Sequence, residues 1–380
     1  MKKYNIIIWE TYSTMGGGQK VSLDILDALK DKYRCIFFVP EEGDLTGNLR
    51  ARGIEYKILP IGSYSDGRKG LKDILTIGLF FPGVLMTAYR HVKKNRISLI
   101  YSNSSRSFIW SSIIGRLLSI PVIWHVHNFV ADNKTLFILN RLGKIGSVRK
   151  VIFVSRAVKE QFPLLKDKAE IIYNGLNIGR FMKGGSGADN KNKLSVPPSV
   201  KIISTISWIS RPKKTEIFLK AVPYVLNRYG GAHFLVVGGV KKGHENYHAS
   251  LLKLVRKLGI TDHVTFTGQR NDISDLLKSI HINCVTSLET YSLTIPESYC
   301  FGVPVIGPDT GGPVELIKDR ETGLIYKFGN EKDLAEKICL LLGNKELHAV
   351  MSRNCKAAAR EFDVAKFDDS IRAAVWRIID

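Results

Sequence analysis

The stretch IHINCVTSLETYSLTIPESYCFGVPVI, residues 280–306, contains a strand–loop–helix–strand pattern from which the fold can be read. Its beginning is rich in β-branched and apolar side chains and is short enough for a buried strand. We expect Ser292 to cap a short helix, because Pro296 is tolerated in a first turn whose N–H groups have no internal partner. Gly302 would end this helix before a second strand at Val303–Ile306.

Two carboxylates frame the predicted loop and helix start. Glu289 falls on the loop, and Glu297 falls one turn into the helix. Carboxylates accept hydrogen bonds from hydroxyls, and the start of a helix favours anions, so this arrangement suits a ligand that carries both hydroxyls and phosphate. Two solvated glutamates beside a loop are the alternative interpretation.

Short apolar runs alternate with helical patterns along the whole chain. This alternation indicates parallel sheets covered by helices, an α/β fold. The runs that we expect to form strands are Ile6–Trp9, Cys35–Val39, Tyr56–Leu59, Leu99–Ser102, Val122–His125, Val151–Val154, Lys201–Ile206, Phe234–Val237, Val264–Phe266, Ile280–Val285 and Val303–Ile306.

Length and one polar stretch together indicate two domains. A chain of 380 residues is long for one domain and comfortable for two. Residues 182–199 contain few apolar side chains and many Gly, Ser, Asn and Lys, which is typical of a linker. We expect residues 1–181 and 200–360 to form two doubly wound, Rossmann-like domains that bind a ligand between them, at the carboxyl ends of the strands. Residues 361–380 would form a helix that returns to the first domain.

The charge balance points to an anionic partner. The net charge is +21, and residues 1–180 carry 28 Lys and Arg against 14 Asp and Glu, whereas residues 181–380 carry 28 against 21. Nucleic acid, anionic lipid and a phosphorylated substrate all remain open. No nucleic-acid-binding motif is recognisable. The basic excess in the first half favours a membrane surface.

The apolar segment Ile74–Tyr89 and the cysteines bear on the compartment. The segment is too short and too interrupted for a spanning helix, which leaves an interfacial apolar helix or a buried helix pair broken at Pro82. The five cysteines form no CxxC pair and no cluster with His at metal-ligand spacing. We therefore expect a cytoplasmic protein, without disulfides or structural zinc, that can lie at the inner membrane face.

Three further patterns follow expected strands. Gly16–Gly18 opens a helix where backbone can approach an anion closely, although a plain tight turn is equally consistent and Val21 excludes a dinucleotide fingerprint. His125 and His127 come at the end of a strand, where they could contact a polar ligand, hold a metal, or be core residues. The cations in 211–214 could neutralise a diphosphate or form a solvated basic loop.

The order of these motifs resembles glycosyltransferase family 4, the group 1 glycosyl transferases. The E-x7-E block with the G-x-P-V-I run is the most specific part of the resemblance. The residues that carry it are Gly16-Gly17, His127, Tyr173-Asn174-Gly175 with Phe181, Lys213, Glu289-x7-Glu297, Gly302-Val303-Pro304-Val305-Ile306, Gly311-Gly312-Pro313-Val314-Glu315 and Thr322-Gly323-Leu324.

The resemblance implies the GT-B fold, with an acceptor-binding first domain and a nucleotide-sugar-binding second domain. Glu297 would bind the ribose hydroxyls of the donor. Glu289 would bind a donor-sugar hydroxyl near the reaction centre, and His127 would contact the sugar. Further implied contacts to the donor come from Gly17 and Lys213 at the diphosphate, from Arg211 in place of a missing cation, and from the backbone of Ser292, Leu293 and Thr294.

Two departures from the family pattern bear on the choice of donor. The family's glycine-arginine pair before the lysine is Ser207-Trp208 here, so one expected phosphate cation is absent. The family's glycines after the first glutamate are Thr290 and Ser292 here, which narrows the space beside the sugar.

The resemblance implies a retaining, metal-independent glycosyltransferase that uses a nucleoside-diphosphate sugar and no other cofactor. Its acceptor would be a lipid-linked saccharide or an envelope polysaccharide, and nucleic acid would not be a partner. The alternative is a catalytically degenerate glycosyltransferase-like subunit that acts as a binding or scaffold protein.

Overall fold

The computed structural model describes residues 4–59, 61, 71–183, 196–197 and 199–379. Its contacts divide the chain into two units, Met1–Gly175 with Val364–Asp380, and Leu176–Asp363. The chain therefore passes into the second unit at Gly175, earlier than residue 181, where the sequence places the end of the first domain. Most of the expected linker, 184–195 and 198, lies outside the described residues.

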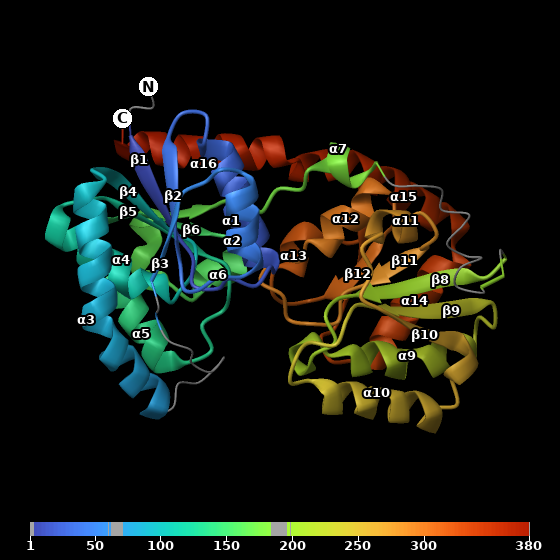
Figure 1. Ribbon diagram of the computed structural model, residues 1–380. Helices are drawn as coiled ribbons and strands as arrows, with labels where there is room; N and C mark the ends of the chain where they lie inside the picture. Colours follow the sequence, from blue (N-terminus) through green and yellow to red (C-terminus); the bar gives the residue numbers. More distant parts are fainter. Residues whose placement is uncertain (1–3, 60, 62–70, 184–195, 198, 380) are drawn as a thin grey trace. The chain divides into compact units, whose positions relative to one another are not determined.

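The first unit is built on a parallel sheet with helices on both faces (Figure 1). The strand order is β3-β2-β1-β4-β5-β6-β7, and all described neighbours are parallel. The strands are β1 (Asn5–Trp9), β2 (Arg34–Val39), β3 (Tyr56–Ile58), β4 (Ile97–Ser102), β5 (Val122–Val126), β6 (Val148–Phe153) and β7 (Ala169–Ile171). The helices are α1 (Gly17–Leu29), α2 (Asp44–Ala51), α3 (Leu71–Lys94), α4 (Ser107–Leu118), α5 (Asn133–Leu142), α6 (Arg156–Glu160) and α16 (Val364–Ile379).

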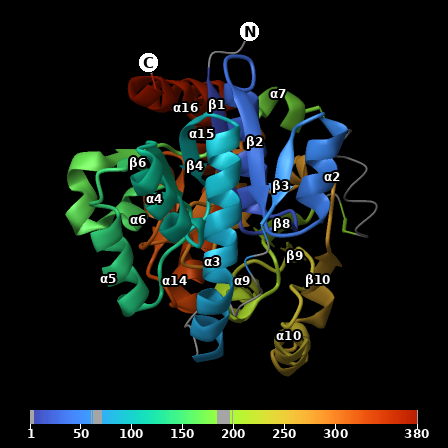
Figure 2. The same ribbon diagram turned by 60° about the vertical axis from the view of Figure 1, so that its left-hand side comes forward.

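Helix α3 excludes one of the two interpretations of Ile74–Tyr89, the helix pair broken at Pro82. It runs without interruption from Leu71 to Lys94, with Pro82 inside it, and lies beside α4 (Figure 2). A proline inside a helix costs about 3 kcal/mol because it removes one main-chain hydrogen bond. Val84, Ala88 and Val92, spaced every four residues, are all buried, and their packing offsets this cost.

The C-terminal helix α16 belongs to the first unit and packs against α1 (Figure 1). Phe367, Ile371 and Val375 are buried in the same apolar cluster as the residues of α1 and β1. Arg372 Nε also donates a hydrogen bond to the carbonyl oxygen of Ala28, at the end of α1, over 2.9 Å. The helix begins at Val364, three residues after the expected start.

The second unit repeats the layered arrangement around a parallel sheet of order β10-β9-β8-β11-β12-β13. Its strands are β8 (Lys201–Ile206), β9 (Ala232–Val237), β10 (Val264–Gly268), β11 (Ile282–Cys284), β12 (Val305–Pro308) and β13 (Gly323–Tyr326). Its helices are α7 (Ile178–Phe181), α9 (Thr215–Leu226), α10 (Glu245–Lys257), α11 (Ile273–Leu277), α12 (Thr294–Cys300), α13 (Pro313–Leu316), α14 (Glu331–Gly343) and α15 (Lys345–Ala359).

The expected alternation is confirmed in both units, and two short strands were not anticipated. β7 and β13 each form the last strand of their sheet, and they span three and four residues. Gly302 ends α12 as predicted: its φ is +69°, and a Cβ at this position would lie 2.7 Å from Ser352 Oγ. Both the backbone conformation and the close approach of α15 therefore require glycine.

Candidate active site

In each unit, predicted site residues follow a strand at the switch point, which is the place where the strand order reverses; His127, which follows β5, lies one strand further along the sheet. In the first sheet the order reverses between β1 and β4, and in the second between β8 and β11. The carboxyl ends of parallel strands diverge at such a point, and ligands of open α/β sheets bind there. Gly17 follows β1, whereas Lys213 follows β8 and Glu289 follows β11.

Lys213 and Glu289 form an ion pair at the switch point of the second unit. Lys213 Nζ lies 2.5 Å from Glu289 Oε1, and Ser287 Oγ donates to the same oxygen over 2.5 Å. Thr286 Oγ1 donates to the backbone carbonyl of Lys213 over 2.9 Å, which ties the loop after β8 to the loop after β11. Both ionic side chains are partly exposed, at 27% and 17%. Among the described residues, Glu289 Oε2 accepts no hydrogen bond. One carboxylate oxygen therefore remains available to a hydroxyl.

The glycines of the loop before α13 hold the Glu289 loop in place. The N–H of Gly312 donates to the carbonyl oxygen of Glu289 over 2.8 Å. A Cβ at Gly312 would lie 2.3 Å from the carbonyl oxygen of Thr290, and a Cβ at Gly311, whose φ is +75°, would lie 2.6 Å from that of Glu289. Only glycine fits this close approach of two backbones.

The start of α12 differs from the sequence prediction. The helix begins at Thr294 with Leu293 as its N-cap residue, and it has no side-chain cap. Ser292 Oγ instead lies 3.0 Å from Thr294 Oγ1, so the expected cap by Ser292 is wrong. The two hydroxyls bond each other because Ser292 lies one residue too early to reach the first helical N–H groups. Glu297 lies in the first turn and is half-buried, as predicted from its position.

The other cations near Lys213 have different partners. The Arg211 guanidinium lies over the Tyr247 ring, 5.7 Å from its centroid, and the Arg211 side chain is exposed. Lys214 Nζ lies 4.0 Å from Glu216. Trp208, at the position of the missing family arginine, is 46% exposed and would lie 3.2 Å from a Cβ at Gly239. Of the cations in 211–214, Lys213 is the one that the structure brings to Glu289.

Gly17 is the first residue of α1 in the first unit, and Gly16 precedes it as the N-cap residue. A Cβ added at Gly17 would meet no atom within 4 Å. Packing within the described residues therefore does not require glycine here, in contrast to Gly312. A requirement for glycine at position 17 would have to come from a ligand.

His127 and His125 have different environments. His125, in β5, is fully buried and lies 2.9 Å from the Tyr101 hydroxyl through Nδ1, which makes it a core residue. His127 is half-buried just after β5; its Nε2 lies 2.7 Å from Asn103 Oδ1. The two rings are in contact, with centroids 4.1 Å apart. Burial lowers the pKa of His127 to about 3 and holds the pKa of His125 well below its ordinary value, so both rings are neutral near pH 7.

A buried polar network around Glu10 was not identified from the sequence. Glu10 directly follows β1, is 1% exposed, and accepts hydrogen bonds from the Thr11 N–H, Gln19, Ser22 and Asn103. Burial raises the pKa of Glu10, and these hydrogen bonds oppose the rise. A charged residue directly after a buried strand was a signal for this network. Asn103 was not detectable as a partner because it lies 93 positions away along the chain.

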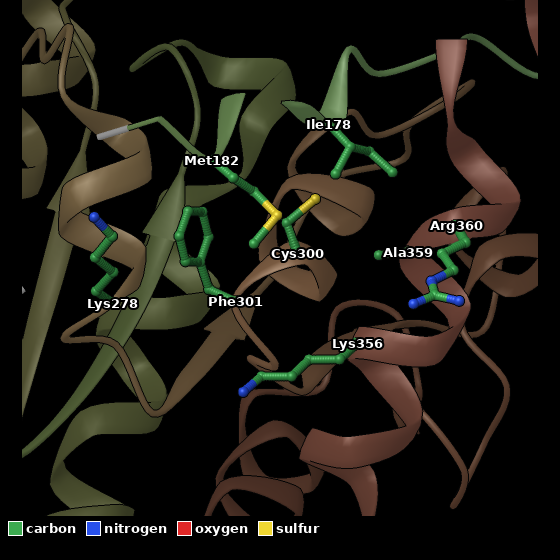
Figure 3. A pocket seen from close by; sticks show the side chains of 8 residues that line it. All are labelled: Ile178, Met182, Lys278, Cys300, Phe301, Lys356, Ala359 and Arg360. Atoms are coloured by element: carbon green, nitrogen blue, oxygen red, sulfur yellow. The ribbon is translucent and has the colours of Figure 1, made fainter. Parts of the chain in front are cut away.

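Other features of the described residues carry no part of the predicted site. The described part of the chain contains no group of three or more His, Cys, Asp and Glu side chains that could hold a metal ion. No described helix is long and apolar enough to cross a membrane. A cavity of about 500 Å³ lies in the second unit at the end of α12 (Figure 3). It is lined by Ile178, Met182, Lys278, Cys300, Phe301, Lys356, Ala359 and Arg360, none of which is a predicted site residue.

Comparison with known families covers both units. The family described as Glycosyltransferase Family 4 matches residues 15–180, and Glycosyl transferases group 1 matches residues 188–358. The chain belongs to this family of glycosyltransferases. The resemblance noted in the motifs is thereby confirmed.

Relatives of the glycosyltransferase include two bacterial enzymes of known activity. The chain is 24% identical to the N,N'-diacetylbacillosaminyl-diphospho-undecaprenol alpha-1,3-N-acetylgalactosaminyltransferase of Campylobacter jejuni, with 90% of each chain covered. It is 23% identical to the UDP-Gal:alpha-D-GlcNAc-diphosphoundecaprenol alpha-1,3-galactosyltransferase of Escherichia coli, with 94% of this chain and 93% of the relative covered.

Solved structures confirm the GT-B fold. Anabaena Alr3699/HepE in complex with UDP is similar with a TM-score of 0.86 and 20% identity, covering 98% of this glycosyltransferase and 100% of that chain. The complex of the same protein with UDP-glucose has a TM-score of 0.82 and 21% identity, covering 98% and 99%. WaaG, a glycosyltransferase involved in lipopolysaccharide biosynthesis, is similar with a TM-score of 0.72 and 13% identity, covering 97% and 98%.

Proposed function

We propose that this glycosyltransferase transfers a hexose-type sugar from a nucleoside-diphosphate sugar to a lipid-linked saccharide or an envelope polysaccharide. The observation that carries the proposal is the Lys213–Glu289 pair at the switch point of the second unit, which leaves one Glu289 oxygen open. The Campylobacter and Escherichia relatives, whose names describe transfer to diphospho-undecaprenol-linked sugars, support this class of acceptor. HepE bound to UDP-glucose supports the class of donor.

The donor would be held by charges of both signs. Glu297, one turn into α12, accepts hydrogen bonds from the ribose hydroxyls, and Glu289 Oε2 accepts from a hydroxyl of the sugar. Lys213 turns toward the diphosphate, with Arg211 as a second cation and the backbone of Ser292, Leu293 and Thr294 as further donors. Gly17 lets the start of α1 approach the diphosphate, and His127 contacts the sugar.

The proposed reaction retains the configuration at the anomeric carbon and uses no metal and no cofactor besides the donor. The bond between the anomeric carbon and the phosphate oxygen breaks, and the acceptor hydroxyl attacks the same face. The proton of that hydroxyl passes to the departing phosphate oxygen. Lys213 stabilises the negative charge that develops on the nucleoside diphosphate. No covalent enzyme intermediate is proposed, because Glu289 is assigned to a sugar hydroxyl.

We further propose a cytoplasmic enzyme that lies at the inner membrane face. The neighbouring helices α3, α4 and α5 carry exposed large apolar side chains. Basic residues such as Arg116 and Arg141 are exposed on the same helices. Apolar side chains flanked by cations are typical of surfaces that bind anionic lipid. The exposed apolar residues are Leu79, Phe80, Met86, Leu117, Phe137 and Ile138.

Flotation with anionic liposomes tests the membrane surface. Binding at low salt that weakens at high salt is expected, because part of the attraction is electrostatic and is screened. A chain that does not float with anionic liposomes at low salt would contradict the proposal. Neutral liposomes serve as the control for the contribution of charge.

A nucleotide-sugar screen with one variant tests the donor site. The correct donor should raise the thermal unfolding temperature of the full chain, since ligand binding stabilises the folded state by mass action. Glu297→Ala should lose this thermal protection, and it should also lose the activity of transferring the sugar to an undecaprenyl-linked saccharide. Glu336→Ala, an exposed glutamate of α14 in the same unit, is the matched control and should keep both.

Calorimetric titration separates the enzyme from a scaffold protein. The glycosyltransferase should bind at least one of UDP, GDP and ADP. Absence of binding to all three would favour a degenerate glycosyltransferase-like subunit, and unchanged donor hydrolysis and transfer in Glu297→Ala would show that the donor site is assigned to the wrong residues.

A further inference from the structure

Glu10 collects four donors at the carboxyl end of β1. Its Oε1 accepts from Ser22 Oγ and, over 2.8 Å, from Asn103 Nδ2; its Oε2 accepts from the Thr11 N–H and from Gln19 Nε2, both over 3.2 Å. All these side chains are less than 10% exposed. A buried carboxyl group is costly unless it is hydrogen-bonded. Several buried polar groups therefore orient Glu10, and none of them belongs to the donor site proposed above.

Asn103 is the group that Glu10 orients. It follows β4, on the other side of the switch point from Glu10, and is 3% exposed. Its Nδ2 lies 2.8 Å from Glu10 Oε1 and 3.2 Å from the carbonyl oxygen of Gly18. A carbonyl oxygen accepts only, so the atom that faces it is the amide NH₂ of Asn103. The orientation of the Asn103 amide is thereby determined by partners on β1 and α1.

The fixed amide determines the state of His127. With Nδ2 turned toward Glu10 and Gly18, the Oδ1 of Asn103 faces His127 Nε2 at 2.7 Å. Oδ1 can only accept, so His127 Nε2 carries a proton and donates it. In a neutral imidazole the other nitrogen, Nδ1, then holds a lone pair. Among the described residues, His127 Nδ1 has no hydrogen-bond partner, and the ring is only half-buried.

We infer that Asn103, oriented by Glu10 and the Gly18 carbonyl, is a positioning residue that holds His127 in the Nε2–H tautomer, so that Nδ1 accepts a hydrogen bond from a hydroxyl of the transferred sugar. This inference rests on the proposed function of His127 and adds the direction of its hydrogen bond. The ligand group that Nδ1 recognises is a hydrogen-bond donor, namely a sugar hydroxyl. A phosphate oxygen, which only accepts hydrogen bonds, would not be held there. The lowered pKa of His127 is consistent with a neutral ring.

The same network links His127 to the glycine loop. Asn103 bonds Gly18, which is the second residue of α1 and lies next to Gly17. Ser22, one turn further along α1, lies 2.6 Å from Asn103 Nδ2. A displacement of the start of α1 would therefore turn the Asn103 amide and with it the His127 ring. The Asn103 side chain therefore connects His127 with the start of α1, the two parts of the first unit that are proposed to contact the donor.

The tautomer can be observed directly in the full chain. Nitrogen-15 labelling of the histidine rings distinguishes a protonated from an unprotonated ring nitrogen by its chemical shift, and comparison with His127→Gln assigns the His127 signals. We expect a neutral His127 with the proton on Nε2 in the wild-type protein near pH 7. A proton on Nδ1 would overturn the inference, and this measurement does not depend on any variant of Asn103.

Asn103→Ala and Asn140→Ala form a matched pair. Asn140 is also buried in the first unit, 6% exposed, and its amide bonds backbone groups of Leu136, Gln161 and Leu164, outside the network. Both variants should lower the unfolding temperature, because each removes a buried amide with its partners. Only Asn103→Ala should mix the two His127 tautomers and lower kcat, by about tenfold, as expected for loss of a group that orients a ligand contact. Asn103→Ala with an unchanged His127 tautomer and unchanged kcat would overturn the inference.

The inference about the His127 tautomer and the proposed transfer reaction can be refuted separately. The nuclear magnetic resonance signals decide the state of His127 and its dependence on Asn103 in the absence of any substrate. Absence of transfer from every nucleotide sugar by the wild-type chain would contradict the proposed function. Donor sugars that each lack one hydroxyl test the hydrogen bond to Nδ1. If the wild type and His127→Gln lose the same affinity for every one of these sugars, the hydrogen bond to Nδ1 is overturned.

Discussion

The two units contain polar clusters at equivalent places in their sheets, and the clusters differ in charge and exposure. The cluster of the second unit is ionic and partly exposed, with Lys213 paired to Glu289, and Glu297 lies in the first turn of the following helix, α12. The cluster of the first unit is buried and centred on Glu10, and it ends in the half-buried, neutral His127. Both follow strands at the point where the strand order reverses.

The proposed function assigns different work to the two clusters. Partly exposed charges suit a diphosphate and ribose, since charge-assisted hydrogen bonds to such groups are strong and the ionic side chains keep enough freedom to change partners. A buried and neutral network suits orientation, because a fully satisfied network holds its members rigidly. The second unit would therefore supply most of the binding energy, and the first would set the direction of one contact to the sugar.

Removal of the Lys213 charge should have the largest effect. Lys213→Met keeps the aliphatic part of the side chain and removes the cation that balances Glu289 and, as proposed, the leaving diphosphate. We expect kcat/KM to fall roughly 10²- to 10³-fold, the range for losing one electrostatic contact in a transition state. Steady-state kinetics with the donor found in the screen measures this.

Lys214→Met is the control for Lys213→Met. Lys214 is the next residue, is exposed, and lies near Glu216 rather than Glu289. Its variant should retain kcat/KM within about twofold, since surface substitutions away from a site usually change little. Equal losses in the two variants would show that the second unit needs only general positive charge.

Substitution of Gly312 should damage the same unit through the backbone. A Cβ here would lie 2.3 Å from the Thr290 carbonyl oxygen, so the Glu289 loop must move. We expect Gly312→Ala to reduce the free energy of unfolding by about 2 kcal/mol or more and to weaken donor binding, because overpacking against backbone costs 1–3 kcal/mol. Denaturant unfolding and calorimetry with the donor test this expectation. Unchanged donor affinity would separate the loop from the donor site.

Substitution of Gly17, in the first unit, should affect activity without affecting stability, in contrast to substitution of Gly312. No atom lies within 4 Å of a Cβ at this position, so Gly17→Ala should change the free energy of unfolding by less than about 0.5 kcal/mol. If α1 approaches the diphosphate closely, as proposed, kcat/KM should still fall about tenfold. Gly47→Ala, in α2, is the control with equally open space. Full activity of Gly17→Ala would remove Gly17 from the proposed site.

Acid should weaken the first unit through His127. The pKa of His127 is lowered to about 3 by burial, whereas an unfolded histidine has a pKa near 6.5, so the unfolded state binds more protons between these values. The contribution of neutral His127 to the free energy of unfolding is therefore fully present above about pH 6.5, and it decreases as the pH falls toward 3. The raised pKa of Glu10 acts in the opposite direction and partly cancels the decrease.

His127→Gln tests the acid effect. Denaturant unfolding at pH 7 and pH 5 should show a smaller pH dependence in this variant than in the wild type, by at most one proton per molecule. An identical pH dependence would mean that His127 titrates in the folded protein as it does in the unfolded chain.

Most of the second unit's site could be predicted because it is local in sequence. Glu289, Ser292 and Glu297 all lie within one strand–loop–helix segment, so their proximity follows from the order of elements alone. The Ser292 cap was wrong because the helix begins at Thr294, and a shift of a residue or two at a helix start is not determined by composition. The pairing of Lys213 with Glu289 was not predictable from spacing, since the two residues are 76 positions apart.

The network of the first unit was missed for the same reason. Glu10 and Asn103 are 93 positions apart, and they meet because β1 and β4 are neighbours in the sheet. Of the two interpretations of the α3 segment, the helix pair broken at Pro82 was wrong for a different reason: tertiary packing of Val84, Ala88 and Val92 overrides the local preference of Pro82 to end a helix.

By itself, the sequence determined the alternation of strands and helices, the two-domain α/β fold and the glycine and carboxylate motifs of the loops. These depend on short-range patterns: the period of apolar residues and the conformations open to glycine and proline. The tertiary structure decided which loops meet, and with it the Lys213–Glu289 pair and the path from Glu10 through Asn103 to His127. Such contacts depend on the order of strands in a parallel sheet, which is set by the packing of the whole unit rather than by any one segment.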